Sequence, residues 1–124
     1  MNLEECYEKI GANYAEMLMR LPNPKLIEKF VGKFLDDDSF DNLSKQLELG
    51  NREEAFNAAH TLKGVCANLR FTRLFDSASL LTEELRNKTD SVSPNALKLY
   101  EGVRRDYETA VNAIKEYFNS NNPQ

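Results

Sequence analysis

The only histidine of the chain, His60, lies in the segment Ala59-His60-Thr61-Leu62-Lys63-Gly64. If this segment is helical, Lys63 and Gly64 follow His60 by three and four residues and lie on the same face. A histidine imidazole is largely neutral near pH 7, and one ring nitrogen then has a lone pair that can act as a nucleophile. Lys63 could neutralise an anion carried on the ring. The spacing therefore indicates a nucleophilic site that suits a phosphoryl group.

Other kinds of reactive site are missing from the sequence. It has no phosphate-binding loop of the G-x-x-x-x-G-K-[ST] type, no second histidine for a metal site, and no serine or cysteine placed beside His60 as a triad nucleophile. Cys6 and Cys66 share no metal-type spacing, so we expect free thiols rather than a disulfide. We predict no cofactor and no metal of its own, and no autonomous enzyme. Whatever reacts at His60 must then be brought by a partner.

Size and composition indicate one globular domain. The chain has 124 residues, 41% of them hydrophobic and 29% charged, which is ordinary for a soluble protein. Its net charge of -4, from 16 basic and 20 acidic residues, offers no basic face for nucleic acid. No apolar segment approaches the roughly 20 residues of a membrane span. We therefore expect a cytoplasmic protein that binds neither nucleic acid nor membrane.

Apolar residues recur at helical spacing along the chain, and strand-like alternation is hard to find, so the predicted fold class is all-α. The helices and their short connections favour an antiparallel up-down-up-down four-helix bundle, preceded by short N-terminal capping helices. Asn51 and Glu54 have the form of a capping box at the start of one bundle helix. The predicted single domain, 1–118, comprises the capping helices in 1–22 and a bundle over 24–118, and 119–124 is a polar tail. The predicted bundle helices are 24–49 (kinked or broken near 36–38), 52–69, 72–88 and 93–118.

The predicted helix over 52–69 has two different faces. At about 100° per residue, its alanines and leucines form one broad side, and His60 lies about 140° from the centre of that side. Phe56, Lys63, Gly64 and Ala67 gather around His60. A glycine in mid-helix costs about 1 kcal/mol relative to alanine, and close approach of another molecule to the backbone would explain Gly64. Phe56 is either part of a docking surface or an ordinary exposed aromatic residue.

The segment from Ala59 to Gly64, with small residues through Ala67 and then Asn68-Leu69, closely resembles the signature of histidine-containing phosphotransfer (HPt) domains. The resemblance covers about 24–118. It implies that His60 accepts a phosphoryl group from the aspartyl phosphate of one response-regulator receiver domain and passes it to the aspartate of another. Lys63 would steady the phosphoryl oxygens and Gly64 would leave room for the receiver's active site. Phe56, Ala67 and nearby residues of 72–88 would form the docking surface.

Arg70 departs from the family pattern, since many members have glycine just after the motif helix. Arg70 either takes a left-handed cap conformation at a cost of about 1 kcal/mol, or the helix continues and turns at Phe71-Thr72. In both cases it places a second cation near the site. The resemblance implies a phosphorelay protein whose partners are receiver domains, with a hybrid histidine kinase as a further candidate, and whose receivers bind the metal ion. The chain shows no receiver or kinase segment, so we expect a free-standing protein, and monomer is the simpler expectation because four helices can close a core within one chain. The alternative function is a non-catalytic helical-bundle module that binds a receiver or kinase without carrying phosphate.

Overall fold

The structure is a computed structural model that describes residues 1–86 and 90–120. Within these residues it contains helices and no strands, which confirms the predicted all-α fold class. No helix among them is long and apolar enough to cross a membrane. The helices are α1 (Leu3–Ile10), α2 (Tyr14–Arg20), α3 (Pro24–Phe34), α4 (Ser39–Glu48), α5 (Arg52–Leu69), α6 (Thr72–Leu85) and α7 (Pro94–Ser120).

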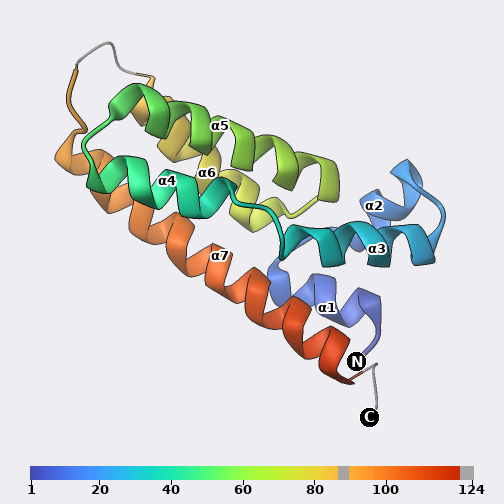
Figure 1. Cartoon of the computed structure of the whole chain (residues 1–124). Coiled ribbons are helices and arrows are strands. Elements are labelled where there is room, and N and C mark those ends of the chain that lie inside the picture. The colour runs from blue at the N-terminus through green and yellow to red at the C-terminus, as the bar shows by residue number, and fades with distance from the viewer. Residues whose placement is uncertain (87–89, 121–124) are drawn as a thin grey trace.

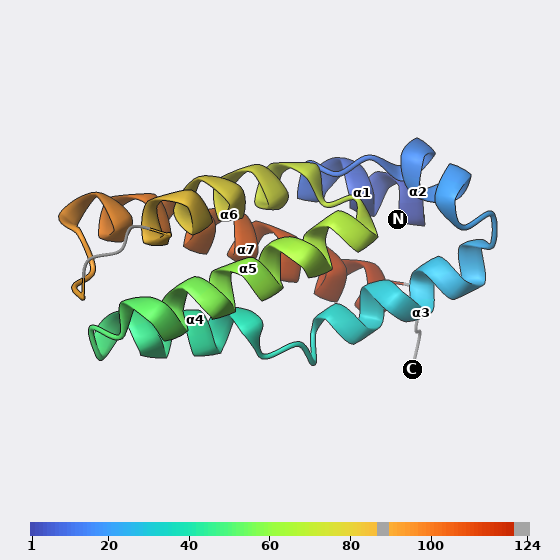
Figure 2. The same ribbon diagram turned by 90° about the horizontal axis from the view of Figure 1, so that it is seen from above.

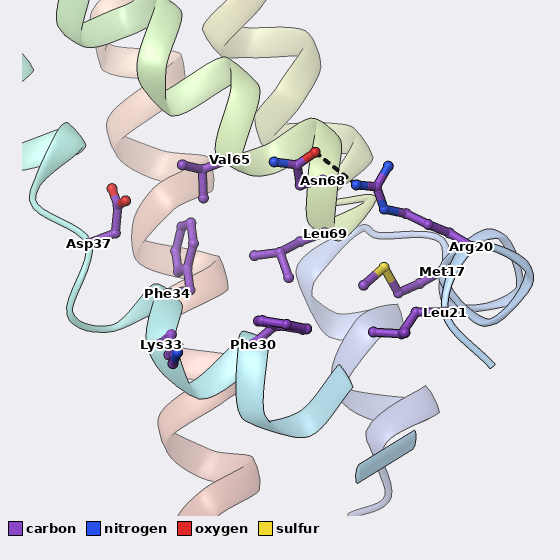
Figure 3. A pocket seen from close by; sticks show the side chains of 10 residues that line it. All are labelled: Met17, Arg20, Leu21, Phe30, Lys33, Phe34, Asp37, Val65, Asn68 and Leu69. Atoms are coloured by element: carbon purple, nitrogen blue, oxygen red, sulfur yellow. Dashed lines mark hydrogen bonds between the residues drawn. The ribbon is translucent and has the colours of Figure 1, made fainter. Parts of the chain in front are cut away.

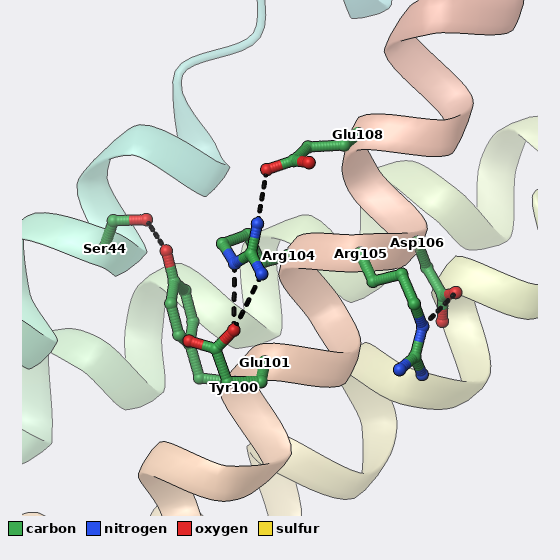
Figure 4. A network of polar contacts seen from close by, with 7 residues as sticks. All are labelled: Ser44, Tyr100, Glu101, Arg104, Arg105, Asp106 and Glu108. Atoms are coloured by element: carbon green, nitrogen blue, oxygen red, sulfur yellow. Dashed lines mark hydrogen bonds and ion pairs between the residues drawn. The ribbon is translucent and has the colours of Figure 1, made fainter.

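Four helices, α4 to α7, pack each against the next in a helical bundle, as Figure 1 shows. The ring of Phe40 in α4 stacks on that of Tyr107 in α7, with centroids 4.0 Å apart. Further along, the hydroxyls of Ser44 in α4 and Tyr100 in α7 are hydrogen-bonded (Figure 4). Because residue numbers rise along α4 as they fall along α7, these two helices run in opposite directions.

The remaining helices lengthen this bundle along α7, which spans about 40 Å at 1.5 Å per residue. In Figure 2, α3 lies nearly in line with α4, and α1 nearly in line with α6. The Lys9 ammonium of α1 is 2.8 Å from the Glu116 carboxylate of α7, and the Tyr117 hydroxyl donates to Glu28 of α3 at 2.9 Å. Helices α1 and α3 therefore contact the C-terminal half of α7.

The ends of the helices test several local predictions. The long element predicted over 24–49 is broken, since α3 ends at Phe34 and α4 begins at Ser39. The Asp37 carboxylate accepts from the Ser39 amide at 2.9 Å, across the break. The predicted capping box at Asn51 is wrong: its side chain makes no cap bond, because its amide donates to the Gln46 side chain at 2.9 Å. A capping box is present at the start of α1.

The last two helices differ slightly from their predicted bounds. α6 ends at Leu85, and the 87–88 part of the predicted 72–88 helix lies outside the described residues. α7 starts after Ser93, whose hydroxyl accepts from the Ala96 amide at 3.0 Å. It continues to Ser120, so 119–120 is helical rather than part of the tail, and 121–124 is also outside the described residues.

Both cysteines are buried and free, which confirms the prediction from their spacing. Burial raises the pKa of the Cys6 thiol to about 11, and the nearby Glu116 carboxylate adds to the effect. Burial also raises the pKa of the Cys66 thiol, with a smaller contribution from Asp37. Because the thiolate is the reactive form, both side chains serve as core residues.

The N-terminal segment is hydrogen-bonded to the turn between α5 and α6. The buried Tyr7 hydroxyl donates to the Leu69 carbonyl at 3.0 Å. Two backbone bonds lie beside it, from the Asn13 amide to the Arg70 carbonyl at 2.9 Å and from the Arg73 amide to the Gly11 carbonyl at 3.0 Å. These bonds fix the C-terminal end of α5 against α1 and α2.

Replacing Tyr7 with phenylalanine should lower the free energy of unfolding by about 1 kcal/mol, because the buried Leu69 carbonyl loses its hydroxyl donor. In a thermal melt, this corresponds to a fall in Tm of about 4 °C. Tyr14→Phe is the matched control, since Tyr14 packs edge-on against Tyr7 and no hydrogen bond of its hydroxyl is found within the described residues. Equal melting temperatures for the two variants would contradict this role of Tyr7.

Candidate functional site

Helix α5 buries one side and exposes the other, as the sequence predicts. The buried side consists of small and apolar residues, and His60 is exposed on the opposite side. Neither ring nitrogen of His60 forms a hydrogen bond within residues 1–86 and 90–120. The imidazole is therefore open to solvent and to a docking partner. The buried residues of α5 are Ala55, Ala58, Ala59, Leu62, Cys66 and Leu69.

Phe56 lies one turn before His60 and is half-buried. Its ring centroid is 6.0 Å from that of His60, and the ring planes are inclined by 31°. The Arg86 guanidinium, from the C-terminal end of α6, lies 4.9 Å from the Phe56 centroid, within the range of a cation–π contact. Phe56 thus joins the His60 surface to α6.

Lys63 lies on the side of α5 that faces α6. Its ammonium is 5.8 Å from the ring centroid of Phe75, and no carboxylate within the described parts of the chain forms an ion pair with it. Lys63 meets the start of α6, whereas Phe56 meets its end, so α5 and α6 run antiparallel. The lysine charge therefore remains available to an incoming anion one turn from His60.

The charged groups near this face are Lys63 of α5, and Glu83 and Arg86 of α6 and its C-terminal cap. Arg86 binds Glu83 through two hydrogen bonds, of 3.1 Å and 3.3 Å. The hydrogen bond from Arg86, followed by its charge, lowers the pKa of the Glu83 carboxyl, and Lys63 contributes further. Glu83 thus stays ionised and is held by Arg86. Lys63 and Arg86 against Glu83 leave this surface with one net positive charge.

Gly64 leaves the backbone of α5 bare beside His60. A Cβ atom built on this glycine would meet nothing within 4 Å, and its backbone does not have a positive φ. Neither packing nor backbone conformation requires a glycine here. The effect of Gly64 is therefore confined to the outside of the helix, where a partner can approach the main chain closely.

Ala67 and Arg70 lie further along α5, and Arg70 is about 15 Å from His60 along the helix axis at 1.5 Å per residue. Arg70 has φ 60° and ψ 36°, so the first alternative, a left-handed cap, is confirmed. Its guanidinium donates to the Ala67 carbonyl and lies 3.8 Å from the Glu16 carboxylate of α2. The structure therefore brings Phe56, Lys63 and Gly64 around His60 and places Arg70 at the far end. Docking by Ala67 and Arg70 stays a prediction.

The sequence did not identify which residues of α6 border the site. Phe75, Glu83 and Arg86 lie on one side of that helix, with Phe75 at the edge of the buried side and Glu83 and Arg86 exposed. Their helical spacing could have shown that they share a face. Only the packing of α6 against α5 in the structure shows that this face adjoins His60.

Among the described residues, no group of three or more His, Cys, Asp or Glu side chains could hold a metal ion. Comparison with protein families gives a match to the model described as Hpt domain over residues 27–117. The chain belongs to the Hpt domain family. Comparisons with curated proteins and with solved structures gave no match. Hpt domains are helical phosphocarrier modules of two-component and phosphorelay signalling, and they interact with receiver domains. The match contains α4, α5 and α6 in full and leaves α1 and α2 outside.

Replacing Gly64 with alanine should raise the free energy of unfolding by about 1 kcal/mol, because a helix interior favours alanine and the new methyl group meets no atom. Gly102→Ala is the matched control in α7, where the nearest atom to the added Cβ would be 3.7 Å away, an ordinary contact. Urea unfolding of both variants measures the change. A Gly64→Ala protein less stable than the original would show that the glycine has a structural role in α5.

Proposed function

We propose that this protein is a phosphorelay intermediate that carries a phosphoryl group on His60 between the aspartates of two receiver domains. The observation that carries the proposal is the exposure of the only histidine on the outer face of α5, with no hydrogen bond to its ring among the described residues, in a chain of the Hpt domain family. In this proposal α4 to α7 are the antiparallel up-down-up-down four-helix bundle. The protein acts as a cytoplasmic monomer.

The transfer is a displacement at phosphorus. The lone pair of a ring nitrogen of His60, Nε2 in this proposal, forms the N–P bond as the bond from phosphorus to the aspartyl oxygen of the receiver breaks. The bonding electrons leave with the aspartate carboxylate, and the proton on the other ring nitrogen stays there. The onward step is the same displacement with a second receiver's aspartate as nucleophile. The metal ion of the receiver supplies charge neutralisation at the transferring oxygens.

The residues around His60 supply a surface for this step. Lys63 has an ammonium that can approach the phosphoryl oxygens without first breaking an ion pair. Gly64 removes the side chain that would separate a receiver from the backbone. Phe56, braced by Arg86, provides apolar contact area next to the imidazole. The Gly64→Ala protein is then expected to fold more stably yet accept phosphate more slowly, whereas Gly102→Ala should transfer normally.

His60→Gln should abolish acceptance of phosphate, since glutamine offers no ring nitrogen and the chain has no other histidine. The measurement mixes purified protein with receivers that carry radiolabelled aspartyl phosphate and follows the label on the protein. Label on the original protein should be acid-labile and alkali-stable, as expected of a phosphoramidate. Matching melting temperatures for the variant and the original protein provide the folding control.

Two results of that experiment would contradict the relay. Label on the His60→Gln protein would place the phosphate on another residue. Binding of receivers without any label on the original protein, across a broad panel, would favour the non-catalytic interaction module instead.

Lys63→Ala should slow acceptance of phosphate by roughly tenfold, the effect of losing one charge-assisted contact to the phosphoryl oxygens. Its free energy of unfolding should fall by no more than about 1 kcal/mol, the value of its contact with Phe75. Lys45→Ala is the control, because Lys45 is exposed and lies in α4, whereas His60 lies in α5. Single-turnover transfer rates decide the matter, and equal rates for all three proteins would remove Lys63 from the mechanism.

A further inference from the structure

A concave site lies between α2, α3 and the C-terminal half of α5. It is a pocket of about 330 Å³, shown in Figure 3. Its residues on α5 include Val65 and Asn68, which lie about 140° and 80° around the helix from His60 at 100° per residue. Val65 thus lies on another side of α5 from His60, whereas Asn68 follows Gly64 by one turn, so the pocket borders the surface proposed for phosphotransfer.

The floor of the pocket is apolar and firmly packed. Met17 and Phe34 are each only 2% exposed, and Leu69 is buried beside them. Phe30 forms part of the wall and remains 42% exposed, an unusual position for a phenylalanine in a small helical protein. Figure 3 shows these side chains converging on the same space from α2, α3 and α5. An apolar molecule bound here would cover surface that is otherwise open to water.

The rim of the pocket carries more positive than negative charge. Arg20 and Lys33 both border it, and neither forms an ion pair within residues 1–86 and 90–120. Asp37 is the carboxylate of the rim, and it already accepts the Ser39 amide at the start of α4. With Asp37 counted, the net charge of the rim is +1, which matches a monoanion.

Two donor residues of the rim, Arg20 and Asn68, lie together at one end, whereas Lys33 lies toward the Asp37 side (Figure 3). The Arg20 guanidinium donates to the Asn68 side-chain oxygen at 3.1 Å, which leaves further N–H groups of Arg20 and the Asn68 amide N–H groups for a ligand. In Figure 3, Asp37 lies at the opposite end of the pocket from Arg20. A carboxylate beside Arg20 and Asn68 would thus be well supplied with donors and distant from the one acid.

We propose that this pocket binds a small carboxylate with an aromatic or aliphatic body. The carboxylate lies against Arg20 and Asn68, and the apolar body lies over Phe30, Phe34 and Leu69. A volume near 330 Å³ is at the lower end of known ligand pockets, which suits a small ligand such as the arylalkanoate 3-phenylpropionate.

The test is a titration of the ¹⁵N-labelled protein with 3-phenylpropionate, followed by amide chemical shifts in NMR. Saturable shifts are expected at residues of α2, α3 and the end of α5. The neutral analogue 3-phenylpropan-1-ol has the same apolar body and should bind roughly tenfold more weakly, because it forms no charge-assisted hydrogen bond. Arg20→Gln should remove that difference, and Arg105→Gln, at an exposed arginine of α7, should preserve it.

Three outcomes would overturn the proposal: shifts that do not saturate or that scatter over the whole surface, equal affinity for acid and alcohol, or an unchanged preference for the acid in Arg20→Gln. The titration is repeated with the His60→Gln protein. Unchanged binding there is expected, and it shows that the pocket stands independently of whether His60 carries phosphate.

Discussion

The close packing of α5 between α4 and α6 is the constraint on which the rest of the structure depends. The inner side of α5 has three fully or nearly fully buried alanines, which allow its neighbours to approach on both sides. Larger residues there would push the neighbours apart. With both flanks occupied, the outer strip of α5 is the part of the helix left to solvent, and His60 stands on that strip. The position of the nucleophile thus follows from packing on the other side of the helix.

The turn after α5 then determines which residues of α6 adjoin the site. Arg70 takes the left-handed conformation that reverses the chain, and its guanidinium satisfies the Ala67 carbonyl. Backbone bonds from Asn13 and Arg73 hold this turn against the N-terminal segment. With one end fixed in this way, antiparallel packing carries Phe75 to Lys63 and Arg86 to Phe56. The docking surface therefore depends on contacts that lie well away from His60.

The sequence pattern within a helix predicted those features that depend on that helix alone. The bounds of α5, 52–69, and the exposure of His60 could be predicted from the spacing of its apolar residues, because this spacing sets which side of the helix is buried. The capping box at Asn51 failed because Gln46, five residues earlier in α4, binds the same side chain, and the box pattern takes no account of residues before the cap. Glu83 and Arg86 could not be assigned to the site from sequence, since their position relative to His60 is a property of the α5–α6 pair. The pocket of α2, α3 and α5 has the same origin, as its walls come from three separated segments.

The surroundings of His60 explain why a protein of this kind serves as a carrier. In a hydrolytic triad a third group orients the histidine and fixes its tautomer, but among the described residues no group bonds to either ring nitrogen of His60. Lys63 and Gly64 offer charge and access, and neither restrains the ring. Orientation must then come from the docked receiver, which also brings the metal ion in the proposed relay. An imidazole whose ring nitrogens bind no group in the described part of the chain is suited to face different receivers in turn, because each can impose its own geometry on the same nucleophile.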